Sequence, residues 1–135
     1  MLTQRSAYGF GKMIELDFAA AVQRVKDALA AEGFGILCEI DVAATMKRKL
    51  DVEFRPYVIL GACNPPLAYR ALVAEPDIGL LLPCNVVVYG GDVPGQTAVA
   101  ALDPVAALGL ADNADLPPLA ETVKDRLSRA LDSIA

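Results

Sequence analysis

The spacing of apolar residues predicts a helix near each end of the chain. Between residues 18 and 29, apolar side chains recur at helical spacing, preceded by Asp17, which can cap a helix, and followed by Gly33, which can end one. A second amphipathic pattern covers residues 119–134, with Pro118 near its first turn, where a missing N–H is tolerated. Both helices are expected to pack one face on the rest of the protein.

Two segments alternate with a period of two and predict strands. Residues 7–14 are the first, with aromatic residues alternating against small ones, and we expect this strand at an edge of the sheet. Residues 35–42 are the second and are expected to be half buried. Its apolar face carries Ile36, Cys38, Ile40 and Val42. A free thiol among aliphatic neighbours behaves as a small hydrophobe, so Cys38 is expected in the core.

Three further runs are apolar at almost every position and predict more strands. They cover residues 57–62, 84–89 and 97–102, and Pro83 precedes the second because proline cannot donate to a strand ladder. A short helix is expected over residues 65–74, since Asn64 is a good N-cap and is followed by proline.

A brief helical pattern is also expected between residues 43 and 50. It places Met46 and Leu50 inward and a basic triplet, residues 47–49, outward.

The predicted order is a strand, a helix, four further strands with two short helical insertions, and a closing helix. This order lacks strict strand–helix alternation, so it favours an α+β fold with a mostly antiparallel sheet over a doubly wound parallel sheet. We expect one domain over residues 1–135. The fully apolar strands need cover on both faces, which helices, a second copy or a small apolar ligand could supply. We expect a homodimer.

The charge balance argues against nucleic acid as a partner. Twelve Lys and Arg against 17 Asp and Glu give a net charge of −5, whereas phosphate backbones bind through many cationic contacts. The basic triplet is interpreted as a solvated helix face. The apolar runs are far shorter than the roughly 20 residues that a membrane helix needs, and the first residues lack a signal-peptide pattern. A cytoplasmic protein without membrane contact is therefore expected.

Histidine is absent from the chain. This removes Ser-His-Asp and Cys-His catalytic arrangements, the usual zinc ligand sets and the commonest general base. The three cysteines, an odd number, are interpreted as free thiols. We expect no metal site, because two neighbouring thiolates are too few ligands, and no cofactor is predicted.

Four segments occur in an order that resembles a known family. They are residues 32–35, 39–42, 61–65 and 81–88, which read EGFG, EIDV, GACNP and LLPCNVVV. Together they resemble the domain-of-unknown-function 302 family over about residues 8–131. The resemblance implies a β-α-β₄-α arrangement similar to TATA-binding-protein-like folds and a tendency to form homodimers. It implies no established activity, and the acidic chain gives no reason to transfer DNA binding from that fold.

Two Cys-Asn pairs are the strongest candidates for a functional site. Cys63 ends a strand just before Asn64 begins a helix, where unpaired backbone N–H groups would favour the thiolate and lower its pKa. If the next strand returns beside this one, Cys84 and Asn85 start close to Cys63, and both pairs share one end of the sheet. The alternative is purely structural, with asparagines that satisfy local backbone groups and cysteines that fill small gaps.

Two weaker candidates carry charge. Asp41 lies on the same strand face as Glu39, and paired carboxylates can perform acid–base chemistry when burial separates their pKa values. Such pairs are more often solvated, or paired with a base such as Lys47 or Arg48. Arg55 could clamp a small carboxylate or phosphate if it faces a pocket.

These observations leave two hypotheses open. The first is a homodimeric, non-catalytic module that binds a small ligand or a protein through the pocket at the sheet end or through the sheet face. The second is a thiol-dependent redox or sulfur-transfer protein in which Cys63 is the nucleophile, Cys84 resolves it and Asn64 helps to stabilise charge. The first is preferred because it requires only packing, and the sequence does not decide whether the protein is an enzyme.

Overall fold

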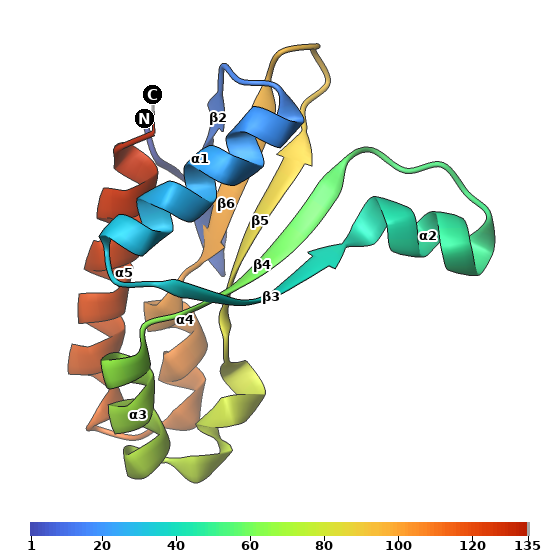
Figure 1. The fold of residues 1–135 in the computed structure, drawn as a ribbon. Coiled ribbons are helices and arrows are strands. Elements are labelled where there is room, and N and C mark those ends of the chain that lie inside the picture. Colours follow the sequence, from blue (N-terminus) through green and yellow to red (C-terminus); the bar gives the residue numbers. More distant parts are fainter. Residues whose placement is uncertain (135) are drawn as a thin grey trace.

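One antiparallel sheet of six strands, in the order β1-β2-β6-β5-β4-β3, organises residues 1–134, the part of the chain that the computed structural model describes. The strands are β1 Thr3–Ser6, β2 Gly9–Ile14, β3 Gly35–Asp41, β4 Tyr57–Cys63, β5 Cys84–Gly90 and β6 Thr97–Leu102. The helices are α1 Phe18–Ala31, α2 Val42–Leu50, α3 Pro65–Ala74, α4 Pro104–Leu108 and α5 Leu116–Asp132, with 3₁₀ turns at η1 Pro76–Leu81 and η2 Gly109–Ala111. The predicted α+β class is confirmed (Figure 1).

The long helices form where the sequence predicts them. The Asp17 carboxylate caps α1 by accepting a hydrogen bond from the Ala20 N–H at 2.9 Å. Gly33 follows this helix with a φ of 85°, a left-handed conformation that glycine adopts without a steric penalty. At the other end of the chain, α5 has proline in its first turn and buries a continuous apolar stripe.

These helices cover one face of the sheet. Leu60, Val86 and Val88 point into that face and are completely buried, whereas their neighbours Ile59 and Val87 are only half buried on the opposite face. Figure 1 shows α1 and α5 lying across the covered face, and α3 and α4 near the end at which β4 finishes and β5 begins. The alternation of burial within uniformly apolar strands leaves an apolar second face, which we call the open face and define by Tyr57, Ile59, Val87 and Tyr89.

The N-terminal strand differs from the prediction. The sequence pattern places an edge strand over residues 7–14, but β2 pairs with β1 on one side and with β6 on the other. The edge on this side is β1, whose mostly exposed residues Thr3–Ser6 read TQRS and have no apolar alternation that would mark them as a strand. A polar edge strand of this kind is held by its neighbour's backbone and is hard to detect from hydrophobicity.

The helix α2 projects away from the rest of the protein with β3 and the segment that leads to β4 (Figure 1). It contains no buried residue, and Leu50 is 66% exposed, so the inward placement predicted for Met46 and Leu50 is wrong. The basic triplet at residues 47–49 is solvated, as predicted. The helix packs only loosely against β4, so none of its residues is fully buried.

Asp103 joins α4 to α5 and so fixes one side of the site described next. Its buried carboxylate accepts hydrogen bonds from the Val105 and Ala106 N–H groups and from the Lys124 ammonium at 2.9 Å. The cap and the ion pair together hold α4 on the last helix.

Candidate functional site

Strands β4 and β5 bring the two cysteine segments together. The strands are antiparallel, with Ala62 opposite Cys84, so Cys63 at the end of β4 and Cys84 at the start of β5 share one end of the sheet. This is the juxtaposition that the sequence analysis expected from Asn64 and Pro83. Both thiols line the same cavity.

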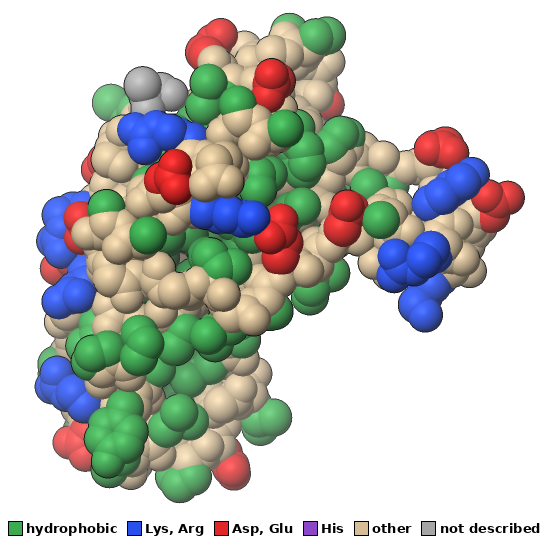
Figure 2. Space-filling view, in the orientation of Figure 1, with side chains coloured by type: hydrophobic (Ala, Val, Ile, Leu, Met, Phe, Trp, Pro, Cys, Tyr) green, Lys and Arg blue, Asp and Glu red, His purple; other side chains and the backbone are tan. Residues whose placement is uncertain are grey.

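The sheet-end cavity, as we call it, has a volume of about 290 Å³ and lies between this end of the sheet and helices α3, α4 and α5. Its walls are almost entirely hydrocarbon and include Phe34, Leu67, Ala71, Leu108, Leu119 and Val123. The polar groups that line it are Cys63, Cys84 and Asn64. In the space-filling view, hydrophobic side chains gather where α3 meets β3 and β4 (Figure 2). The cavity is therefore suited to an apolar ligand.

Burial sets the protonation of the two thiols. Desolvation raises the pKa of Cys63, and it raises the pKa of the more deeply buried Cys84 to about 11, with a smaller contribution from the nearby Cys63. The lowered pKa that the sequence analysis expected for Cys63 is therefore wrong. Desolvation by the apolar walls disfavours the thiolate, so both groups are neutral thiols at pH 7.

Cys38 is exposed rather than buried, which corrects its predicted place in the core. The cause is a register shift in β3, where Ile36 pairs with Ala62 but Cys38 pairs with Gly61. The extra residue, Leu37, lines the sheet-end cavity. The bulge thus reverses the alternation of faces along β3, and an edge strand leaves Cys38 accessible to solvent.

Asn85 and Asp41 do not join the cavity. Asn85 is exposed on β5 and faces the side opposite to Cys84. Asp41 caps α2, since its carboxylate accepts a hydrogen bond from the Ala44 N–H at 2.9 Å. Asp41 therefore serves the projecting helix.

The neighbour of Asp41 on its strand face has a structural role as well. Glu39 pairs with Lys26 of α1 at 2.7 Å, rather than with the basic triplet. Lys47 instead pairs with Asp51 and Glu53. An acid–base role for this pair of carboxylates has no geometric support.

Arg55 also lies away from the cavity. Its guanidinium donates to the Gly90 carbonyl at 3.1 Å, pairs with Asp92 at 3.3 Å and lies 5.9 Å from the centre of the Tyr89 ring. It ties the segment before β4 to the turn after β5, which is a local structural role.

Asn64 differs from the N-cap that the sequence predicts. It occupies the capping position of α3, but its side chain makes no capping hydrogen bond. The residue is only 6% exposed, and its amide hydrogen-bonds to no other described residue. The amide instead lines the cavity and approaches Gly33, where a Cβ atom would lie 3.2 Å from the Asn64 Nδ2.

Arg126 of α5 is a site residue that the sequence analysis missed. Its Nη1 would lie 3.4 Å from the same Gly33 Cβ position, so the Asn64 amide and the Arg126 guanidinium both lie close to this point. Arg126 follows the cavity-lining Val123 by three residues and shares its helix face. Helical spacing could have indicated this face, but the position of Arg126 beside Gly33 depends on the tertiary fold.

The described residues also limit other kinds of site. Within residues 1–134, no group of three or more His, Cys, Asp or Glu side chains is arranged to hold a metal ion. Nor does any helix in that range have the length and apolar character to cross a bilayer.

Comparison with known proteins assigns the family. The family model described as "Domain of unknown function DUF302" matches residues 10–134. The chain belongs to the DUF302 family. This DUF302 domain is similar to a crystal structure of an uncharacterized conserved DUF302 protein from Bacillus stearothermophilus, at 29% identity over 94% of this chain and 98% of that chain, with a TM-score of 0.85. No curated protein matches the sequence. The family therefore establishes a fold for this DUF302 domain, and its function has to be argued from the cavity.

Proposed function

We propose that this protein is a non-catalytic module that binds a small, mostly apolar ligand in the sheet-end cavity and acts as a homodimer. The observation that carries the proposal is the cavity of about 290 Å³, with hydrocarbon walls and a few polar groups. Ligand sites in proteins have this composition, because apolar walls supply affinity and a few placed polar groups fix orientation. The core itself is otherwise well filled, with side chains such as Leu60, Leu127 and Leu131 completely buried.

The state of the thiols favours binding over thiol chemistry. A thiol-dependent function needs an accessible thiolate nucleophile at neutral pH. The raised pKa of Cys63 and the burial of Cys84 work against that requirement. As neutral thiols, both groups contribute soft, weakly polar surface to a ligand site.

Titration with 1-octanol tests the cavity directly. We expect the wild-type protein to bind this probe in isothermal titration calorimetry. Ala68→Phe should weaken binding roughly tenfold or more, because Ala68 lines the cavity and the new ring would occupy part of it. Val73→Phe is the matched control, since Val73 lies on the same helix, is 66% exposed and does not line the cavity. Equal binding by Ala68→Phe and wild type, with circular dichroism showing both folded, would contradict the proposal.

The open face supports the homodimer. Tyr57 and Tyr89 stack across it with ring centres 5.1 Å apart, and Ile59 and Val87 pair beside them, half buried. Apolar faces of this kind are rarely left to water, because each large apolar side chain that is covered gains roughly 1.5–3 kcal/mol. A second copy presents the same apolar face and can cover it by two-fold pairing.

Light scattering tests the dimer at micromolar concentration. We expect a mass of twice the 14.2 kDa of one chain. Replacing Ile59 by lysine should return the mass to that of one chain, because the pairing would then bury an unpaired charge. A one-chain mass for the wild-type protein would rule out this part of the proposal.

A further inference from the structure

We propose that the ligand of the sheet-end cavity is a small monocarboxylate, with its carboxylate held between Asn64 and Arg126 and its hydrocarbon part inside the cavity. The inference rests on the proposed function, since it names the chemical class of the same ligand. Gly33, Asn64 and Arg126 form what we call the polar corner.

The first observation in favour of a carboxylate ligand concerns the side-chain amide of Asn64. More than nine-tenths of this residue is buried, and its amide has no hydrogen-bond partner among the described residues, although it can donate two hydrogen bonds. The amide nitrogen and oxygen are not sealed off, because every fully buried side-chain nitrogen and oxygen among the described residues has a hydrogen-bond partner. They are therefore open to the cavity, where water or a ligand can pair with them. An amide that lines a cavity in this state is suited to receive its partner from a ligand.

The second support is the contrast between two arginines of α5. Arg129 pairs with Glu32, with 3.0 Å between Nε and Oε1. Arg126, one turn earlier, has no carboxylate within 4 Å in the described part of the chain. Glu32 is therefore already paired with Arg129. The Arg126 guanidinium keeps N–H donors in the geometry that binds a carboxylate bidentately.

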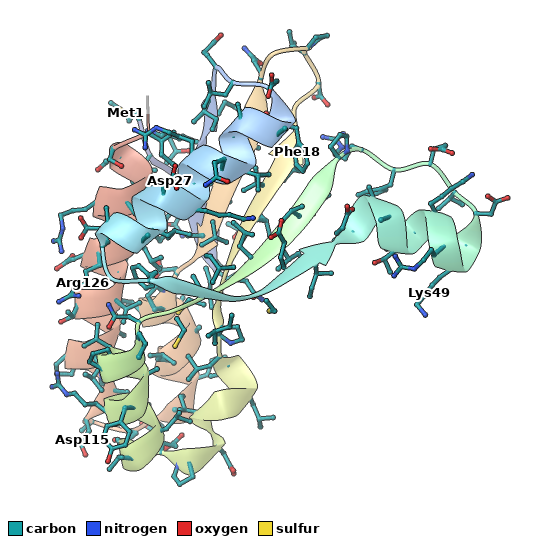
Figure 3. All side chains as sticks on the ribbon, viewed as in Figure 1. Met1, Phe18, Asp27, Lys49, Asp115 and Arg126 are labelled. Carbon is teal, nitrogen blue, oxygen red and sulfur yellow. The ribbon has the colours of Figure 1, made fainter. Side chains whose placement is uncertain are left out.

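Gly33 keeps the space between these two groups open. A Cβ atom at this position would lie 3.2 Å from the Asn64 Nδ2 and 3.4 Å from the Arg126 Nη1. With glycine, both nitrogens can reach the same pair of oxygens. Figure 3 shows Arg126 on α5 beside the turn that leads from α1 into β3, which contains Gly33.

The polar corner adjoins the hydrocarbon part of the site. Phe34, the next residue after Gly33, lines the cavity, as does Val123, three residues before Arg126. A molecule can therefore contact the corner and the cavity at once. If each water-sized group occupies about 30 Å³, the cavity of about 290 Å³ holds roughly ten such groups, close to the size of octanoate.

Calorimetric titration with sodium octanoate and with 1-octanol separates the head group from the hydrocarbon. We expect the wild-type protein to bind octanoate roughly tenfold more tightly than octanol. Arg126→Gln should lose that preference while its octanol affinity stays unchanged. Arg24→Gln on α1 is the control for loss of a surface arginine and should leave both affinities unchanged, because Arg24 is exposed, donates to the Ser133 carbonyl and does not line the cavity.

The outcomes distinguish this inference from the function on which it rests. Octanol binding without a preference for octanoate, or an octanoate affinity that Arg126→Gln does not lower, would overturn the carboxylate and leave the apolar site in place. Absence of binding of both probes to the wild-type protein would overturn the proposed function itself. Thermal melts of the three proteins check that each variant is folded.

Discussion

Replacing Gly11 with alanine is expected to lower the free energy of unfolding by about 3 kcal/mol or more, a loss typical of severe overpacking. A Cβ atom at this position would lie 2.0 Å from the Val99 carbonyl oxygen and 2.7 Å from the Ala100 Cα. These are backbone atoms of β6, so the contact cannot be relieved by turning a side chain. β2 would have to separate from β6 along part of its length. Urea denaturation followed by circular dichroism measures the loss.

Gly35→Ala is the matched control for this substitution. Gly35 begins β3, and a Cβ atom there would meet no heavy atom within 4 Å. Its replacement is expected to change stability by less than about 1 kcal/mol, because alanine also reduces the freedom of the unfolded chain. A Gly11→Ala variant as stable as the Gly35→Ala variant would show that β2 and β6 are not packed as closely as described.

Alkylation with iodoacetamide at pH 7 is expected to label Cys38 first and Cys84 last, with at least a roughly 100-fold difference in rate between them. Cys38 is exposed, whereas Cys84 is buried and its pKa is raised from 9.0 to about 11. Each unit of pKa lowers the thiolate fraction about tenfold at neutral pH, and burial slows the reaction further. Cys63, with a pKa raised by burial, should lie between the two.

Peptide mapping by mass spectrometry gives the three rates separately, and Cys38 serves as the internal control for an exposed thiol. The rate at Cys84 should continue to rise up to about pH 11, because only the thiolate reacts. Faster labelling of Cys63 than of Cys38 at pH 7 would contradict the burial argument and would favour the thiol-dependent hypothesis.

Local signals were sufficient to predict most of the fold. Proline and asparagine mark the start of α3, and the helix occupies Pro65–Ala74 as expected. Pro83 precedes β5, and β6 occupies Thr97–Leu102, as its apolar run predicts. The polar strand β1 could not be found in this way, because its backbone pairing with β2 leaves no trace in the hydrophobic pattern.

The candidate site was predictable in its position but not in its chemistry. The end of β4 and the start of β5 must meet in an antiparallel pair, so the neighbourhood of Cys63 and Cys84 follows from chain order. The direction of the Cys63 pKa depends instead on walls contributed by distant helices, including Leu108 and Leu119. The sequence shows where α3 begins, but it does not show the desolvation that raises the pKa of Cys63.

Two further differences between the sequence-based predictions and the structure, at Cys38 and Arg126, have similar physical causes. The bulge at Leu37 changes the face on which Cys38 lies, and a single extra residue in a strand has no hydrophobic signature. The approach of Arg126 to Asn64 joins two segments that are far apart in the chain, across a glycine whose sequence signal is that of a helix terminator. Both features arise from the tertiary fold and not from local sequence.

The most direct test of the account is to map where 1-octanol binds, using methyl ¹H–¹³C NMR spectra of the protein during titration. The account predicts saturable shifts at the cavity-lining methyl groups, those of Ala71, Leu108 and Leu119 among them, and none at Ile59 or Val87 on the open face. Shifts confined to the open face, or no saturable shift at the cavity methyl groups, would contradict the claim that the sheet-end cavity is a ligand site.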